Sequence, residues 1–246
     1  MELSALLTNS LVQDITATAI TFAIALSWLK VVNTLAQRGW LEQKLSRKII
    51  HIGTGPFVVL CWHLYSEQAI ARYFAALVPL AITLQFLAIG TQLIADPAAV
   101  QAMTREGKPA EILRGPLYYG IAFILCTVLF WRNSPVGILA LMLMCGGDGL
   151  ADVVGRRLGK HKLPFSLHKS WAGSAAMFLG SFGFGLGFLA LFNHLGHFQP
   201  TLNLVSATGA VAAIALVATL VEALPFPDID NITLVAVAIA MGLWLL

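Results

Sequence analysis

Charged residues are scarce in this chain of 246 residues: only 11% are Asp, Glu, Lys or Arg, compared with roughly 25% in an ordinary soluble domain. Hydrophobic residues make up 58% of it, in blocks near the roughly 20 residues that cross a hydrocarbon core. The composition therefore excludes an ordinary soluble enzyme and predicts an all-α, polytopic transmembrane helix bundle. Because no change in composition marks off a soluble part, we expect a single membrane domain over residues 1–246.

Cysteine and N-terminal positive charge are also rare. The three cysteines, Cys61, Cys126 and Cys145, lie inside apolar blocks and show no metal-ligand spacing. We expect them to act as small packing residues. The first 14 residues contain no Lys or Arg, unlike the basic start of a cleaved signal peptide, so the first apolar block is expected to remain as a helix.

The apolar blocks predict eight membrane-spanning helices. The fifth and eighth blocks are short, so either is a candidate for a tilted, broken or re-entrant helix, and seven spans is the alternative. The expected helices lie near residues 15–33, 49–66, 72–95, 116–132, 134–149, 171–193, 204–224 and 230–246.

The basic residues indicate which way these helices cross. All 15 except Arg72 and Arg132 fall in or beside the first, third and fifth connections between the expected helices. Since Lys and Arg accumulate in cytoplasmic loops, we expect both termini outside and the basic loops in the cytoplasm or its equivalent. Tryptophans near span ends, such as Trp62 and Trp131, are expected in the headgroup layer.

The segment from Cys145 to Ser174, CGGDGLADVVGRRLGKHKLPFSLHKSWAGS, carries the strongest chemical signal. An ionised Asp at the membrane centre costs at least roughly 2.5 to 3.5 kcal/mol, so Asp148 is expected to face a polar cavity or the interface. The glycines around it, including Gly147 and Gly149, predict an unwound backbone whose N–H groups form an anion-binding nest.

If helix resumes after Gly149, then Asp148, Asp152, Arg156 and Lys160 share one face. Such a face suits a metal-bound nucleoside triphosphate, because Mg²⁺ prefers one or two carboxylates plus phosphate oxygens while arginine pairs with the remaining phosphate charge. The alternative is a basic membrane-flanking loop whose two acids pair locally. A Walker A loop is excluded: GRRLGKH has three residues between its glycines where that motif has four, and His161 replaces the metal-binding Ser or Thr.

Three further clusters lie at the same expected side of the membrane. Arg47, Lys48 and His51 begin the second helix; the two cations also fit ordinary positive flanking, whereas an ionisable residue as deep as His51 is a functional candidate. A mixed-charge loop carries Glu111 and Arg114, and it predicts either a lid over phosphates or solvated salt bridges.

The last cluster precedes the final helix. It contains Glu222, Asp228, Asp230 and Asn231 and predicts either a second set of metal ligands or an acidic turn that caps that helix.

Taken in order, five motifs make the chain resemble the membrane-bound polyprenol kinases, which include dolichol, phytol and farnesol kinases. They are RKIIH at 47–51, EILRGPLYY at 111–119, GGDGLADVVGRRLGKHKLPF at 146–165, KSWAGS at 169–174 and VEALPFPDIDN at 221–231. Dolichol kinases tend to have Glu where this chain has Ala172, so the chain is more similar to the phytol and farnesol branch.

The resemblance implies transfer of the terminal phosphate of CTP to an isoprenoid alcohol such as phytol, with Mg²⁺ as the metal, as in phytol salvage and tocopherol biosynthesis. From the residues themselves we expect Asp148 and Asp152 to hold the metal, and the candidate catalytic residues and proton acceptors are Asp148, Asp152 and His51. The nucleotide-binding residues that the resemblance implies, together with the basic and glycine neighbours we add to them, are Gly147, Gly149, Gly155, Arg156, Arg157, Gly159, Lys160, Lys169, Ser170 and Gly173.

The expected partners are a nucleoside triphosphate, an isoprenoid alcohol and membrane lipids, with no nucleic acid, and the oligomeric state is open. The expected location is a bacterial inner membrane, a thylakoid membrane or a plastid membrane, with the active site on the cytoplasmic side. One alternative is a cytidylyltransferase of the CDP-diacylglycerol synthase type, which would release pyrophosphate instead of CDP. A transporter is a weaker alternative, because no inverted repeat is visible.

Overall fold

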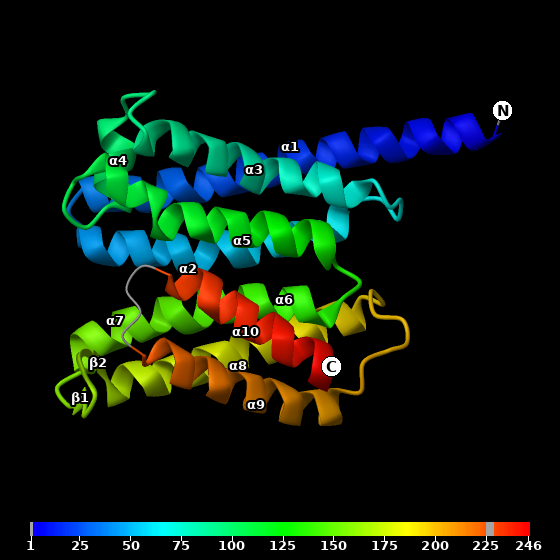
Figure 1. Cartoon of the computed structure of the whole chain (residues 1–246). Helices are drawn as coiled ribbons and strands as arrows, with labels where there is room; N and C mark the ends of the chain where they lie inside the picture. Colours follow the sequence, from blue (N-terminus) through cyan, green and yellow to red (C-terminus); the bar gives the residue numbers. More distant parts are fainter. Residues whose placement is uncertain (1, 225–228) are drawn as a thin grey trace.

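The computed structural model describes residues 2–224 and 229–246 and confirms an all-α bundle (Figure 1). All eight expected helices are present in this part of the chain. Their bounds are α1 (Glu2–Gln37), α2 (Gln43–Cys61), α3 (Ala71–Gly90), α5 (Gly115–Leu129), α6 (Pro135–Met142) with α7 (Gly149–Leu158), α8 (Trp171–His194), α9 (Leu204–Glu222) and α10 (Asp230–Leu245).

Short elements complete the described chain. They are the helix α4 (Pro97–Met103), 3₁₀ turns at Trp62–Leu64 and Pro109–Leu113, and an antiparallel hairpin of β1 (Lys162–Leu163) and β2 (Ser166–Ser170). The sequence patterns did not predict the hairpin, which lies within the basic segment after α7.

Six stretches within residues 2–224 and 229–246 are long and apolar enough to cross a membrane. Of the remaining expected helices, α10 has only 16 residues, and α2 carries Lys44, Arg47 and Lys48 in its first half. A transmembrane helix satisfies all its backbone hydrogen bonds internally, which explains why the apolar blocks locate the helices well.

The fifth helix is longer than predicted and lies at the centre of the bundle. It runs unbroken from Pro135 to Leu158, with a π-helical turn at Leu143–Asp148 between α6 and α7. In its most apolar window 83% of the residues are buried, against 22 to 39% for the other five spans. In Figure 1 it lies between a layer containing α1, α3 and α5 and a layer containing α8 and α9. Protein therefore surrounds its polar residues, and lipid does not.

The expected unwinding beside Asp148 is wrong, because Gly146 to Gly149 remain helical. Close packing against α8 explains why glycine is needed there. A Cβ atom on Gly180 would lie 2.7 Å from the carbonyl oxygen of Gly146, and one on Gly147 would lie 2.2 Å from the Ser181 hydroxyl. These glycines bring the central helix against α8, and their N–H groups do not form an open nest.

The connections that carry most basic residues meet at one end of the bundle, on the left of Figure 1. This basic end is formed by the loops after α1, α3 and α7 together with the hairpin. The opposite end contains the loops after α2, α5 and α8 and the C-terminus. The predicted segregation of charge therefore corresponds to two physical ends of the molecule.

A polar and aromatic cluster organises the opposite end. The Arg132 side chain is 1% exposed and donates hydrogen bonds to the carbonyl oxygens of Trp62, Tyr65 and Ser66, at 2.7, 2.8 and 2.9 Å. Trp62 and Trp131 pack ring to ring, with centroids 5.2 Å apart, and are 0% and 6% exposed. These two tryptophans are therefore core residues, and their predicted place in the headgroup layer is wrong.

Arg132→Leu is expected to lower the free energy of unfolding by about 3 kcal/mol or more. The substitution leaves three carbonyl groups without their charged donor in a buried place, and each such loss costs roughly 1 to 3 kcal/mol. The measurement is the thermal unfolding midpoint of the protein in detergent. Arg72→Leu at the same end, where the cation is more exposed, serves as the control, and equal shifts in both variants would contradict the prediction.

Candidate functional site

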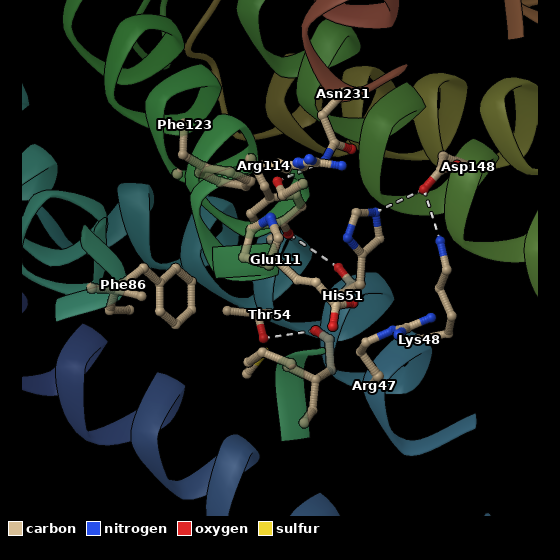
Figure 2. Close-up of a pocket in the computed structure, with 18 of the residues that line it drawn as sticks. Arg47, Lys48, His51, Thr54, Phe86, Glu111, Arg114, Phe123, Asp148 and Asn231 are labelled. Carbon is tan, nitrogen blue, oxygen red and sulfur yellow. Dashed lines mark hydrogen bonds and ion pairs between the residues drawn. The ribbon is translucent and has the colours of Figure 1, made fainter. Parts of the chain in front are cut away.

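Ionisable side chains from two distant parts of the chain converge at the basic end. The Lys48 Nζ lies 3.1 Å from Asp148 Oδ2 and 3.9 Å from Asp152 Oδ2. His51 Nε2 lies 3.3 Å from the same Asp148 oxygen (Figure 2). Lys48 and His51 share a face of α2 because they are three residues apart, and the two acids are one turn apart on the central helix. The start of α2 and the segment after Cys145 thus form one site.

The π-helical turn fixes the orientation of His51. His51 Nε2 lies 3.1 Å from the carbonyl oxygen of Met144 within that turn. A carbonyl oxygen can only accept, so Nε2 carries the hydrogen, and in the neutral ring Nδ1 is an acceptor. The Tyr119 hydroxyl donates to the His51 carbonyl oxygen at 3.0 Å, and the two rings lie 4.6 Å apart. His51 is therefore held from both the α5 and the central-helix sides.

The charged face of α7 is shorter than predicted. Arg156 Nε lies 2.9 Å from Asp152 Oδ1, as the four-residue spacing predicts. Lys160, however, lies beyond the end of α7 at Leu158, so its expected place on the same helical face is wrong. The other oxygen of Asp152, Oδ2, is buried and has no hydrogen-bond partner.

The two carboxylates fit a metal that arrives with phosphate. Asp148 and Asp152 each present an oxygen to the same ammonium group, and Asp152 Oδ2, which lies 3.9 Å from Lys48 Nζ and accepts no hydrogen bond, has spare capacity to bind a cation. Residues 2–224 and 229–246 contain no group of three or more His, Cys, Asp or Glu that would hold a metal alone. Mg²⁺ commonly uses one or two carboxylates plus substrate phosphates, so this small donor set suits it.

Two cavities of about 580 Å³ each open onto Asp148, and one of them also opens onto Asp152. The polar cavity lies between α7, α8, the hairpin and the end of α9. The apolar cavity lies between α2, α3 and α5 and has its polar mouth at the basic end. Both cavities are lined by Lys48, Arg105, Asp148 and Asp230. These four residues therefore mark the place where occupants of the two cavities would meet.

The predicted site residues divide between these cavities. Besides the shared residues, the polar cavity receives Asp152, Gly155, Arg156, Gly159, Lys169, Ser170 and Gly173. The apolar cavity receives Arg47, His51, Glu111, Arg114 and Asn231.

Four predicted nucleotide-binding residues line neither cavity: Gly147, Gly149, Arg157 and Lys160. The first two are packing positions, since a Cβ on Gly149 would lie 2.1 Å from Ile52. Arg157 and Lys160 are exposed. Asp228 lies outside the described residues.

Glu111 holds the loop at residues 105–108 in place at the mouth of the apolar cavity. Its carboxylate accepts backbone N–H groups from Arg105, Glu106 and Lys108, at 2.7, 3.0 and 3.1 Å. The alternative prediction for this loop was solvated salt bridges, and one such bridge joins Lys108 to Glu106. The hydrogen bond from Lys108 to Glu106 raises the pKa of Lys108. Glu111 itself acts differently, because it fixes the backbone that carries Arg105 between the two cavities.

Residues at the start of α8 close the polar cavity. The Ser170 hydroxyl accepts the N–H of Gly173 at 3.1 Å and thereby caps α8. Lys169 forms an ion pair with Glu222 at the end of α9, and the Glu222 side chain is only 5% exposed. Lys169 was expected to contact the nucleotide alone, but in the structure it also neutralises this buried acid.

Lys169→Met is expected to destabilise the protein by roughly 3 to 5 kcal/mol, because it leaves the Glu222 carboxylate buried without its cation. Adding Glu222→Gln removes that charge, so the double variant should regain most of the stability. Thermal unfolding of both single variants and the double variant measures this coupling. The apparent KM for nucleotide should stay raised in the double variant; a return to the wild-type KM would show that Lys169 serves only to pair with Glu222.

Sequence reasoning missed Tyr119 as a positioning residue. The only signal was its place in EILRGPLYY, since a tyrosine one turn inside an apolar helix is ordinary. It also gave Lys48 too little weight, because a lysine at the cytoplasmic end of a membrane helix is equally well explained by the usual basic flank of such helices. The contacts of both residues join α2 to other helices and have no local pattern.

Named relatives match almost the whole chain. Probable phytol kinase 1, chloroplastic, of Oryza sativa subsp. japonica is 45% identical over 233 residues, which cover 94% of this chain and 74% of the relative. Probable phytol kinase, chloroplastic, of Triticum aestivum is 43% identical over 92% of this chain and 75% of the relative. Phytol kinase 1, chloroplastic, of Arabidopsis thaliana is 40% identical over 94% of this chain and 76% of the relative.

No family model and no solved structure matches the chain. The matches to the named relatives nevertheless cover more than nine tenths of the chain at 40 to 45% identity. Kinases of this kind require a phosphate donor, which agrees with a cationic cavity next to an apolar one. The chain belongs to the phytol kinase family of membrane enzymes.

Proposed function

We propose that this protein is a CTP-dependent phytol kinase, which transfers the terminal phosphate of the nucleotide to the hydroxyl group of a membrane-dissolved isoprenoid alcohol. The names of its relatives support the reaction class. The observation that carries the assignment of the site is the pair of cavities that share Lys48 and Asp148. A kinase for a lipid alcohol needs one cationic compartment and one apolar compartment that meet at a point.

The polar cavity is the proposed nucleotide site. Arg156 and Lys169 line it and would neutralise the triphosphate, while Lys48 and Arg105 lie where the terminal phosphate would meet the alcohol. Phosphoryl transfer depends mainly on positioning and on electrostatic stabilisation of the phosphate oxygens, and these cations provide both. Asp148 and Asp152 would hold Mg²⁺, which when bound supplies further charge neutralisation.

The acceptor hydroxyl is proposed to lie beside His51, at the inner end of the polar mouth. The hydroxyl oxygen attacks the terminal phosphorus, the bond from that phosphorus to the bridging oxygen breaks, and the nucleoside diphosphate leaves. The hydroxyl proton must pass to an acceptor, and His51 Nδ1 suits this role because Nε2 donates to Met144. Asp148 remains an alternative acceptor, although Lys48 and His51 already occupy it.

Purified protein incubated with terminally labelled CTP and a panel of phytol, farnesol, geranylgeraniol and dolichol tests this proposal. We expect labelled phytyl phosphate and CDP, with less product from dolichol. In a parallel reaction with a lipid phosphate as acceptor, release of pyrophosphate with retention of cytidylate on the lipid would identify a cytidylyltransferase instead. ATP and GTP in parallel reactions determine the nucleotide preference.

We further propose that the basic end faces the nucleotide-containing compartment, which is the cytoplasm or the stroma, in a bacterial, thylakoid or plastid membrane. Single cysteines at Lys108 and Lys162 should react with a membrane-impermeant maleimide from that side alone, and one at His197 from the other side. The native cysteines Cys61, Cys126 and Cys145 are buried, which keeps the background low. Reaction of the first two from opposite sides would contradict the proposed topology.

A further inference from the structure

Three side chains line the apolar cavity farthest from the basic end, and we call them its floor. They are Val58 of α2, Val78 of α3 and Phe123 of α5, and their side chains are buried, at 5%, 0% and 3% exposed. Val58 lies two helical turns beyond His51, which is roughly 10 Å along α2. Phe86 and Phe123 lie on the side of the cavity away from Asp148 (Figure 2). The cavity therefore extends from the reacting centre into the apolar interior as far as these three side chains.

Close helix packing fixes the position of this floor. A Cβ on Gly120 would lie 2.1 Å from Thr83 Oγ1, so α5 and α3 approach each other closely beside it. A Cβ on Gly55 would lie 2.2 Å from Cys145 Sγ and 2.8 Å from the Phe123 ring, so α2 is similarly tight against the central helix and α5. The floor belongs to helices that touch on both sides and is not a flexible loop.

We infer that the apolar cavity binds the isoprenoid chain of the acceptor and that Val58, Val78 and Phe123 limit how much of that chain is accepted. This inference rests on the proposed function. It assigns the specificity for chain length, which the relatives' names do not address beyond phytol, to three residues that do not touch the reacting groups.

The bilayer makes this selectivity asymmetric. An isoprenoid chain already lies in an apolar solvent before it binds, so leaving lipid for an apolar cavity gains little from the hydrophobic effect. Excess length, in contrast, forces side chains out of their favoured rotamers or displaces helices that are already in contact. A larger side chain at the floor should therefore lower kcat/KM strongly for long acceptors. A smaller side chain there should allow longer acceptors to bind and change kcat/KM little for short ones.

Val78→Phe and Phe123→Ala test the two directions of this effect. With wild type and each variant, kcat/KM is measured for geraniol, farnesol, phytol and the much longer solanesol at fixed mole fraction in the same detergent micelles. Val78→Phe should lower the phytol-to-geraniol ratio by about tenfold or more. Phe123→Ala should raise the solanesol-to-phytol ratio by about tenfold, and the KM for CTP should be unchanged in both variants.

Leu77→Phe is the matched control. It introduces the same phenylalanine ring one residue before Val78 on α3. Leu77, however, is 45% exposed on the outer surface of the bundle and lines neither cavity. Its phytol-to-geraniol and solanesol-to-phytol ratios of kcat/KM should equal those of wild type. Because each ratio compares kcat/KM for two acceptors on one preparation, a partial loss of folded protein affects both values equally and does not change the ratio. If Val78→Phe does not fold, the solanesol-to-phytol ratio of Phe123→Ala alone tests the inference.

Two results would overturn the inference while leaving the proposed function intact. One is an unchanged chain-length profile in a folded variant that still phosphorylates prenols, and the other is an equal shift in Leu77→Phe. If wild-type protein phosphorylates no prenol at all, the proposed function itself fails.

Discussion

Asp148→Asn is expected to reduce phosphorylation by about 10² to 10³-fold, the range for removal of one essential electrostatic contact. Asparagine keeps the shape and one carbonyl oxygen of aspartate but removes its charge. In the structure this carboxylate is 7% exposed and lies against both Lys48 and His51, so asparagine would remove the negative charge that these two side chains share. The measurement is the initial rate at saturating phytol and CTP, with the unfolding midpoint measured in parallel.

Asp152→Asn is the companion variant and should cost less, about 10 to 10²-fold. Asp152 is more exposed, at 24%, and Arg156 already occupies one of its oxygens. Partial recovery with excess Mg²⁺ or with Mn²⁺ would indicate a weakened metal site, whereas no recovery would leave the role of proton acceptor open. If both variants kept substantial activity at ordinary Mg²⁺, the metal assignment would be defeated, and Asp228 and Asp230 would be the next candidates.

Lys48→Met should lower kcat by about 10²-fold and also raise the KM for nucleotide. Lys48 lines both cavities and contacts both acids. Methionine keeps most of its length and its apolar stem while removing the charge. Lys48→Arg should recover only part of the activity, because the broad guanidinium fork does not reproduce a compact ammonium between two carboxylates.

Lys44→Met provides the control for Lys48. Lys44 lies one turn earlier on α2, carries the same charge, is exposed and lines neither cavity. Its kinetics should match those of wild type. If Lys44→Met and Lys48→Met behaved alike, the basic start of α2 would be reassigned to membrane orientation alone.

The candidate site was predicted best where one helix carries several of its residues. Asp152 and Arg156 were paired correctly from their spacing, because four residues make about one turn whatever the surroundings are. Gly147 and Gly149 were assigned to nucleotide binding because glycines there could form an anion-binding nest, and Gly149 also because the family resemblance implied it. The structure places them against α8 and α2 instead, and a single sequence does not distinguish a glycine needed for packing from one needed at a ligand.

The sequence by itself determined that this protein folds in a lipid bilayer, which segments are helical, and that the basic residues gather at one end. Each depends on local composition: an apolar block of sufficient length must form a helix in lipid to satisfy its own backbone, and its flanking cations record an orientation. The same local reasoning named most of the charged residues that line the two cavities.

Only the tertiary structure decided which of those residues meet. Lys48 and Asp148 are 100 residues apart, and their contact requires α2 to pack against the central helix. At the opposite end, contacts between segments far apart in the sequence likewise bury Arg132, Trp62 and Trp131. Such contacts depend on how close two helices approach, which is set by side chains on both helices and by glycines between them, and no spacing within one segment records that distance.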